Sequence, residues 1–292
     1  MADKTGHPTV DIPHIAPLIH ATSSTTSLSL SSQRILLGTF LGDRLSPTVY
    51  LTSLASRGAP GLQHTFPRSS AIRSIWTSSA TPAASGELLL GTSTAAVLLR
   101  PHNHALQTTE FRIKSDVFAT AFLRETPHPF LAGSRDGDMR LFDVRASANV
   151  RPDIVIRHGG TITHIRQLGE TGVVVNGLAR CASYDLRYPH PASPSAGFAR
   201  ATAAGAVWEG VVAAGASVVG LGFDVCEERG VMVAADQECG VKMWSLGTGE
   251  RVRGAWDRRW EVPCRGLWFE GGAGKTERLW AAEGGKMVCF EY

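Results

Sequence analysis

The sequence predicts an all-β protein built from repeated small antiparallel sheets, and three observations lead to this prediction. The 31 glycines among 292 residues indicate many turns. Short apolar runs recur in groups of three, separated by polar loops, whereas long helical patterns are hard to find. Comparable residues of successive groups also recur at similar intervals. Together these features favour the all-β class over folds that contain long helices.

The clearest single unit is 130–145, with the sequence FLAGSRDGDMRLFDVR. An apolar run comes before Asp136-Gly137, and near-alternating apolar residues follow it. Aspartate and glycine tolerate the left-handed backbone of a two-residue hairpin loop. The unit is therefore predicted to be a β-hairpin, with Asp136 as a structural residue of its turn.

The same order of strands recurs along the chain, so that six copies can be recognised. An alternating pattern at 22–32 indicates a further strand before the first copy. Each copy consists of two or three β-like segments joined by polar or glycine-containing loops. The predicted segments are 34–40 and 48–54; 71–79, 87–93 and 94–100; 116–123 and the hairpin 130–145; 161–168, 172–179 and 181–187; 217–224, 230–237 and 240–246; 264–270, 278–283 and 286–292.

The spacing of the copies predicts a β-propeller. An aromatic or apolar residue late in the third strand recurs at intervals of 48, 44, 42, 60 and 46 residues. Propeller blades repeat every 40 to 50 residues or so. The long interval contains the proline- and alanine-rich segment 188–210, which is predicted to be an inserted loop. Six blades are expected, or seven if this segment and the N-terminal tail hide another. The marker residues are Tyr50, Leu98, Phe142, Tyr184, Trp244 and Phe290.

The two ends of the chain are expected to meet in one blade. The last copy has three recognisable strands, so its fourth strand is expected from the N-terminal region, which would close the ring and cover a sheet edge. Residues 1–20 are therefore predicted to be a tail or a closing strand. Residues 21–292 are predicted to form a single propeller domain.

Composition and charge exclude several classes of function. A net charge of +3 and 19% charged residues give no sign of a concentrated basic face, so nucleic acid is an unlikely partner. The N-terminal sequence lacks the apolar segment of a secretory signal, and the most apolar window, 210–223, is too short to span a bilayer. The five cysteines form no C-x-x-C pair. We expect a cytoplasmic or nuclear protein with no membrane segment, metal, cofactor or small-molecule substrate.

Two strand ends carry a more specific pattern, FDVR at 142–145 and YDLR at 184–187. The repeats resemble WD-repeats, and these two endings resemble the W-D-x-R boxes of substrate receptors of cullin-four RING ubiquitin ligases. The region 233–253 with the last blade is similar to associated factor four of that group. The resemblance covers roughly 34–292 and implies a non-enzymatic scaffold that docks on the DNA-damage-binding adaptor of the ligase. No copy ends in a true Trp-Asp pair, so the hydrogen-bond tetrad of strong WD-repeats is incomplete.

The resemblance assigns roles to particular residues. Arg145 and Arg187 would contact the adaptor, because a guanidinium offers several donors to carboxylates or carbonyls. Asp143 and Asp185 are expected to cap the following turns through hydrogen bonds to the backbone. His158 stands where the family often has Gly-His and is expected to bond within its blade.

Two other functions are kept as alternatives. The first is a WD-repeat scaffold in another assembly, such as an RNA-processing or chromatin complex. It is suggested by the interleaved arginines and tryptophans of 251–268, which nucleic acid could contact by phosphate binding and stacking, although packing on a blade edge explains them equally well. A salt-dependent gel shift that is lost on removal of Arg258 and Arg259 would favour it. An enzymatic propeller is the weakest alternative, because the strand ends name no convergent set of acids, bases or metal ligands.

Overall fold

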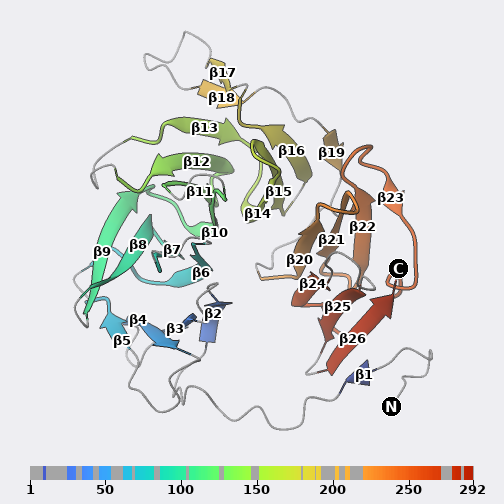
Figure 1. The fold of residues 1–292 in the computed structure, drawn as a ribbon, viewed down its shortest axis with the longest axis horizontal. Coiled ribbons are helices and arrows are strands. Elements are labelled where there is room, and N and C mark those ends of the chain that lie inside the picture. Colours follow the sequence, from blue (N-terminus) through green and yellow to red (C-terminus); the bar gives the residue numbers. More distant parts are fainter. Residues whose placement is uncertain are drawn as a thin grey trace. The chain divides into compact units, whose positions relative to one another are not determined.

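The computed structural model describes residues 9–10, 25–30, 35–41, 46–53, 62–67, 70–81, 86–102, 105–124, 128–145, 151–178, 180–187, 189–191, 201–203, 208–210, 220–270, 278–283 and 286–291. Every regular element within these ranges is a β-strand. Figure 1 labels the strands along the chain. None of the described segments is a helix long and apolar enough to cross a membrane.

The described strands form six four-stranded antiparallel sheets, as the repeat spacing predicted. In the first five sheets the strands pair in chain order, and the sixth takes its outer strand from the other end of the chain. The first three sheets consist of β2 (Thr25–Leu30), β3 (Ile35–Leu41), β4 (Pro47–Ser53) and β5 (Leu62–Thr65); β6 (Ile75–Ala80), β7 (Leu88–Thr92), β8 (Ala95–His102) and β9 (Ala105–Arg112); and β10 (Val117–Phe122), β11 (Pro129–Ser134), β12 (Asp138–Asp143) and β13 (Ile154–Arg157).

The remaining sheets follow the same plan. The fourth to sixth consist of β14 (Ile162–Leu168), β15 (Gly172–Gly177), β16 (Cys181–Asp185) and β19 (Trp208–Gly210); β20 (Phe223–Cys226), β21 (Val231–Ala235), β22 (Val241–Ser245) and β23 (Arg251–Val252); and β24 (Gly266–Glu270), β25 (Arg278–Glu283), β26 (Lys286–Glu291) and β1 (Thr9–Val10). The pairing of β1 with β26, Thr9 opposite Val288, supplies the fourth strand that was expected from the N-terminal region.

By the packing of its backbone, the chain divides into two compact units, Met1–Leu18 with Leu178–Ser183 and Ala206–Tyr292, and Ile19–Gly177 with Tyr184–Gly205. The prediction of one domain over 21–292 stays a prediction. The second unit contains the first three sheets and both arginine boxes.

Burial on both faces explains why several strands are apolar without alternation. Leu88, Leu89 and Leu90 of β7 are all fully buried. Successive side chains of a strand point to opposite faces. Leu88 and Leu90 accordingly pack in one apolar cluster with Val49 and Ile75, while Leu89 packs in another that includes Phe111, Phe130 and Phe142. Middle strands of stacked sheets therefore read as continuous apolar runs.

The Asp136 hairpin differs from the predicted two-residue loop. Strand β11 ends at Ser134 and β12 begins at Asp138, so three residues connect them. The N–H of Gly137 donates to the carbonyl of Ser134, and Gly137 has a φ of +82°. Asp136 does not adopt a positive φ. A tight turn followed by one left-handed glycine makes this hairpin, so Asp136 acts through its carboxylate and not through its backbone.

Two other segments differ from their predicted structure. Residues 217–219 of the expected strand 217–224 lie outside the described residues. In the described part, β20 begins at Phe223, after Gly220, whose φ of +85° a strand does not accommodate. The segment 188–210, predicted to be a loop, contains β17 (Pro189–Pro191), β18 (Ala201–Ala203) and β19. The first two pair with each other, and β19 pairs with β16 as the fourth strand of its sheet. Among the described residues, this segment therefore contributes one strand to the fourth sheet and a separate two-stranded sheet, and it does not form a seventh four-stranded sheet.

Candidate functional site: the two aspartate-arginine boxes

The first box lies where β12 ends. The backbone N–H of Arg145 donates to Oδ1 of Asp143 over 2.8 Å, which closes a turn directly after the strand. The guanidinium folds back onto the same carboxylate, with Nε 3.0 Å from Oδ1 and Nη2 2.5 Å from Oδ2. The Arg145 side chain is 68% exposed. Asp143 therefore caps the turn and also fixes the direction of an exposed guanidinium.

The second box, at the end of β16, repeats this geometry. The N–H of Arg187 lies 2.9 Å from Oδ1 of Asp185, Nε lies 3.1 Å from the same oxygen, and Nη2 lies 2.6 Å from Oδ2. The Arg187 side chain is 60% exposed. Strands β12 and β16 are the third strands of their sheets, and each is followed by an exposed arginine with the same local conformation.

The aspartates stay ionised throughout the physiological pH range. Hydrogen bonds from the guanidinium and the backbone N–H of Arg145 lower the pKa of Asp143 to about 2, and Arg187 does the same to the pKa of Asp185. A lowered folded-state pKa means that each pair contributes above the ordinary carboxyl pKa of about 4 and is lost as the pH falls toward 2. Both pairs are therefore intact at neutral pH.

The aspartate contacts each guanidinium side-on, along one edge. The carboxylate engages the edge that carries Nε and Nη2, so the Nη1 side points away from the aspartate. A guanidinium held in one orientation loses less side-chain entropy when it binds a partner. The two boxes are thus suited to contact carbonyl or carboxylate groups of another protein.

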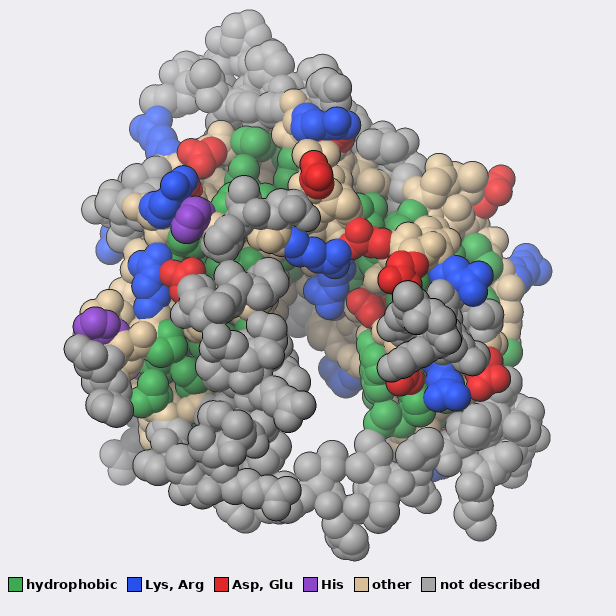
Figure 2. Space-filling view, viewed as in Figure 1, with side chains coloured by type: hydrophobic (Ala, Val, Ile, Leu, Met, Phe, Trp, Pro, Cys, Tyr) green, Lys and Arg blue, Asp and Glu red, His purple; other side chains and the backbone are tan. Residues whose placement is uncertain are grey.

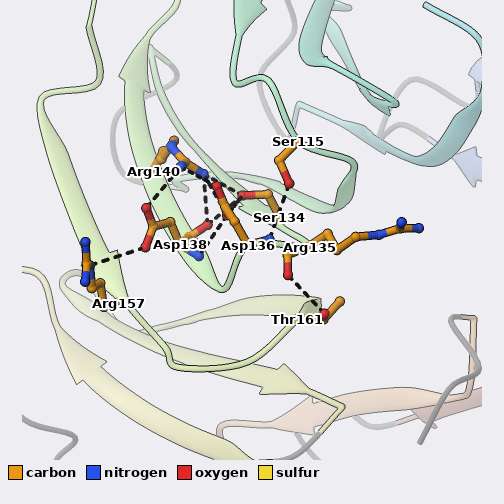
Figure 3. Close-up of polar contacts among 8 residues, drawn as sticks. All are labelled: Ser115, Ser134, Arg135, Asp136, Asp138, Arg140, Arg157 and Thr161. Atoms are coloured by element: carbon orange, nitrogen blue, oxygen red, sulfur yellow. Dashed lines mark hydrogen bonds and ion pairs between the residues drawn. The ribbon is translucent and has the colours of Figure 1, made fainter.

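A buried ionic network, which the sequence interpretation missed, holds the turn of the third sheet (Figure 3). Arg140 of β12 is only 7% exposed. Its Nη2 lies 2.7 Å from Oδ2 of Asp136 and 3.0 Å from Oδ2 of Asp138, and its Nη1 donates to Oγ of Ser134. The Ser134 hydroxyl donates in turn to Asp136 over 2.7 Å. Asp136 is therefore held by a strand arginine.

Charge compensation decides the ionisation of Asp136. Burial alone would raise the pKa of its carboxyl, but hydrogen bonds from Arg140 and Ser134 outweigh burial and keep that pKa below its ordinary value. The fifth sheet contains a shorter version, in which Lys242 Nζ lies 2.8 Å from Oδ2 of Asp236. Arg140 and Lys242 both stand two residues before the strand aromatic, Phe142 or Trp244. This recurrence is the sequence signal that could have identified the network.

His158 lies in the core of its sheet and contacts the aromatic residue of the second box. Its side chain is fully buried, and Nδ1 lies 3.0 Å from the hydroxyl oxygen of Tyr184. Its backbone N–H donates to the carbonyl of Gly137. His158 thus connects the turn of the third sheet with β16, the strand that ends at Asp185 just before Arg187.

Replacing Tyr184 with phenylalanine is expected to lower the free energy of unfolding by about 1–2 kcal/mol, because it leaves a buried imidazole nitrogen without this hydroxyl. Chemical unfolding followed by circular dichroism measures the change. Equal stability of wild type and Tyr184→Phe would contradict a structural role for this bond.

Packing accounts for part of the arginine- and tryptophan-rich segment 251–268. Trp256 and Trp260 are buried, and the guanidinium of Arg258 lies 4.5 Å from the ring centroid of Trp260. Arg251 forms an ion pair with Asp257. On the face drawn in Figure 2, basic side chains are interspersed with acidic ones. These contacts favour the blade-edge interpretation over a nucleic-acid track.

The described residues contain no group of three or more His, Cys, Asp or Glu side chains arranged to hold a metal ion. The two boxes place ordered hydrogen-bond donors at the surface, and this chemistry suits recognition. The adaptor-binding role of Arg145 and Arg187 stays a prediction.

Comparison with known proteins supports the fold. Neither a protein-family model nor a curated protein sequence matches this chain. Among solved structures, the chain is similar to the β-propeller domain of Cps50 (Swd1) from Myceliophteria thermophila, with a TM-score of 0.67 and 14% identity over 94% of this chain and 85% of that chain. Similarity at this identity concerns the fold alone. With its six four-stranded sheets, the chain therefore has an all-β, β-propeller fold.

Proposed function

We propose that this protein is a non-enzymatic interaction scaffold that serves as a substrate receptor, docking on the adaptor of a cullin-RING ubiquitin ligase through Arg145 and Arg187. The observation that carries this proposal is the repetition of one geometry at two strand ends. In each box an aspartate caps the turn and orients an exposed guanidinium. The aspartate alone is enough to cap the turn. The arginine that stands two residues after it in both boxes is therefore the residue for which we infer a function.

The β-propeller fold supports the first part of the proposal, that the protein is an interaction scaffold. A propeller presents strand ends and loops from several sheets on a rigid frame, which suits recognition of other proteins. Fold alone does not specify a partner. The choice of the ligase adaptor rests on the resemblance of FDVR and YDLR to the W-D-x-R boxes.

The double variant Arg145→Ala, Arg187→Ala is expected to bind the purified adaptor at least tenfold more weakly than the wild type, which corresponds to about 1.4 kcal/mol. Each lost guanidinium removes a charge-assisted hydrogen bond to the partner. Titration calorimetry with the DNA-damage-binding adaptor of the cullin-four ligase measures the effect. Arg157→Ala is a matched control, because Arg157 is 76% exposed and also faces an aspartate of the same unit.

A second pair of variants tests whether orientation matters. Asp143→Asn with Asp185→Asn keeps both guanidinium groups but removes their charged partners, so binding is expected to fall by a smaller factor. Lysines in place of both arginines keep the charge without the planar fork and are expected to bind as weakly as the alanines. Unchanged affinity of the double alanine variant would exclude adaptor docking through the boxes.

A further inference from the structure

A group of four residues at the other end of the third sheet has the composition of a binding surface. This Trp76 cluster consists of Trp76 in β6, Asp116 and Phe118 around the start of β10, and Arg135 in the turn between β11 and β12. Trp76 is 37% exposed, and the Arg135 side chain is 61% exposed. Tryptophan and arginine are the residues most enriched among those that dominate binding energy at protein interfaces.

The two aromatic residues of the cluster, Trp76 and Phe118, lie where the pairing of neighbouring strands is irregular. In the second sheet the register passes from Ile75 to Thr77, and in the third it passes from Val117 to Ala119. Trp76 and Phe118 are thus the extra residues of β-bulges, and the first strand of each of the first four sheets has such a bulge at the equivalent place. Bulges redirect side chains and are common beside functional sites. The two rings then meet edge to face across neighbouring sheets, with centroids 5.4 Å apart.

Asp116 fixes the cluster in one arrangement. Its Oδ1 accepts a hydrogen bond from the indole N–H of Trp76 over 3.0 Å, and its Oδ2 lies 3.0 Å from Nε of Arg135. The Arg135 guanidinium lies over the ring of Phe118 at 5.4 Å. Its backbone is also held, because its N–H donates to the carbonyl of Asp116 and its carbonyl accepts from Thr161. An exposed tryptophan and an exposed arginine are therefore ordered before any partner arrives.

The orientation of Arg135 indicates what it would bind. In Figure 3 its side chain extends away from the ionic network around Arg140. Because Nε is engaged by Asp116, the edge with Nη1 and Nη2 remains for a second, bidentate contact, and the planar partner of such a contact is a carboxylate.

The charges around the cluster favour an acidic partner. Exposed Arg73 stands three residues before Trp76, and exposed Lys114 stands two residues before Asp116. Their backbone N–H groups bond to the adjacent residues Ser93 and Thr94, so these two basic residues lie at the same turn. Arg73, Lys114 and Arg135 carry three positive charges, whereas Asp116 is the one acidic residue of the cluster. The central position of Asp116 nevertheless disfavours a polyphosphate, whose repeated charges would approach this carboxylate.

We propose that the Trp76 cluster binds an extended peptide segment of a partner protein, which presents an aspartate or glutamate carboxylate to Arg135 beside an apolar side chain that packs on Trp76. This site lies apart from the first arginine box. The turn with Arg135 precedes β12 and the box follows it, so the length of the strand, about 17 Å at roughly 3.3 Å per residue, separates them. One partner could therefore bind at each end.

The test is a selection from a displayed library of random 12-residue peptides on the full-length protein. Enriched peptides are expected to carry Asp or Glu next to a large apolar residue. A synthetic peptide from the selection is then titrated against variants: Arg135→Ala and Trp76→Ala should each weaken binding at least tenfold. Arg145→Ala, which removes an arginine of similar exposure, should leave it unchanged, and circular dichroism verifies that each variant is folded.

A double-mutant cycle identifies the carboxylate contact. Changing the acidic residue of the peptide to its amide should weaken binding to the wild type about as much as Arg135→Ala does, and should cost little more when both changes are combined. The site assignment is independent of the proposed adaptor docking: Arg135→Ala should leave adaptor affinity unchanged, and the Arg145, Arg187 double variant should leave peptide affinity unchanged.

Several results would overturn the proposal. These are the lack of any enriched peptide, enriched peptides without an acidic residue, or undiminished binding to Arg135→Ala. Binding of a 20-nucleotide single-stranded RNA that Arg135→Ala abolishes would assign the cluster to nucleic acid instead. Self-association in analytical ultracentrifugation that Trp76→Ala abolishes would assign it to a second copy of the chain.

Discussion

Replacing Arg140 with methionine is expected to lower the free energy of unfolding by about 2–4 kcal/mol. The change keeps most of the side-chain volume but leaves Asp136 and Asp138 without the guanidinium that lies within 3.0 Å of both carboxylates. Breaking a buried pair by removing one partner typically costs about 3–5 kcal/mol. The Asp136 side chain is 39% exposed, so water compensates part of this loss. Urea unfolding followed by circular dichroism measures it.

The pH dependence of the same variant distinguishes lost charge pairing from poor packing. Because the pKa of Asp136 is lowered in the folded protein, its stabilisation is present above the ordinary carboxyl pKa and is lost as the pH falls through the folded value. The difference between wild type and Arg140→Met should therefore shrink below about pH 4. Arg140→Lys, which keeps the charge, should lose less stability. A difference that is constant with pH would show that packing, and not the ionic network, explains the loss.

The network also shows where sequence patterns stop being informative. Arg140 lies in a strand next to Met139, and alternation suggests that one of two such neighbours faces solvent. Both are buried instead. The reason is that Asp136 and Asp138, together with Ser134, surround the guanidinium, and this arrangement depends on the turn geometry. The sequence pattern that the third and fifth sheets share here is a basic residue two positions before the strand aromatic.

The strands themselves could be predicted well because their signal is local. Apolar runs bounded by turn residues identified the middle strands, and the spacing of the strand aromatics identified the blades. The strand β19 could not be found this way, because its three residues are held by pairing with β16, far away in sequence. The start of β20 was placed too early, since an apolar run that contains Gly220 does not reveal a left-handed backbone.

The candidate sites follow the same division. The two arginine boxes were recognisable, because each lies within four consecutive residues. The Trp76 cluster was not, because it joins residues of β6, the start of β10 and the turn after β11 through two bulges. A bulge shifts a side chain without leaving a distinct pattern in the sequence. Contacts between neighbouring sheets therefore become visible only in three dimensions.

Phe142→Ala is expected to have the largest effect of any single change proposed, a loss of about 3–5 kcal/mol in the free energy of unfolding. Phe142 stands where a WD-repeat usually has tryptophan, yet it is only 2% exposed and stacks on Phe130 with ring centroids 5.4 Å apart. It also contacts Phe111 of the second sheet at 5.4 Å, so truncation opens a cavity between two sheets. Phe142→Leu should lose clearly less, because it fills most of that volume. If urea unfolding gave the alanine variant a loss below about 1 kcal/mol, Phe142 could not be the residue that holds these two sheets together.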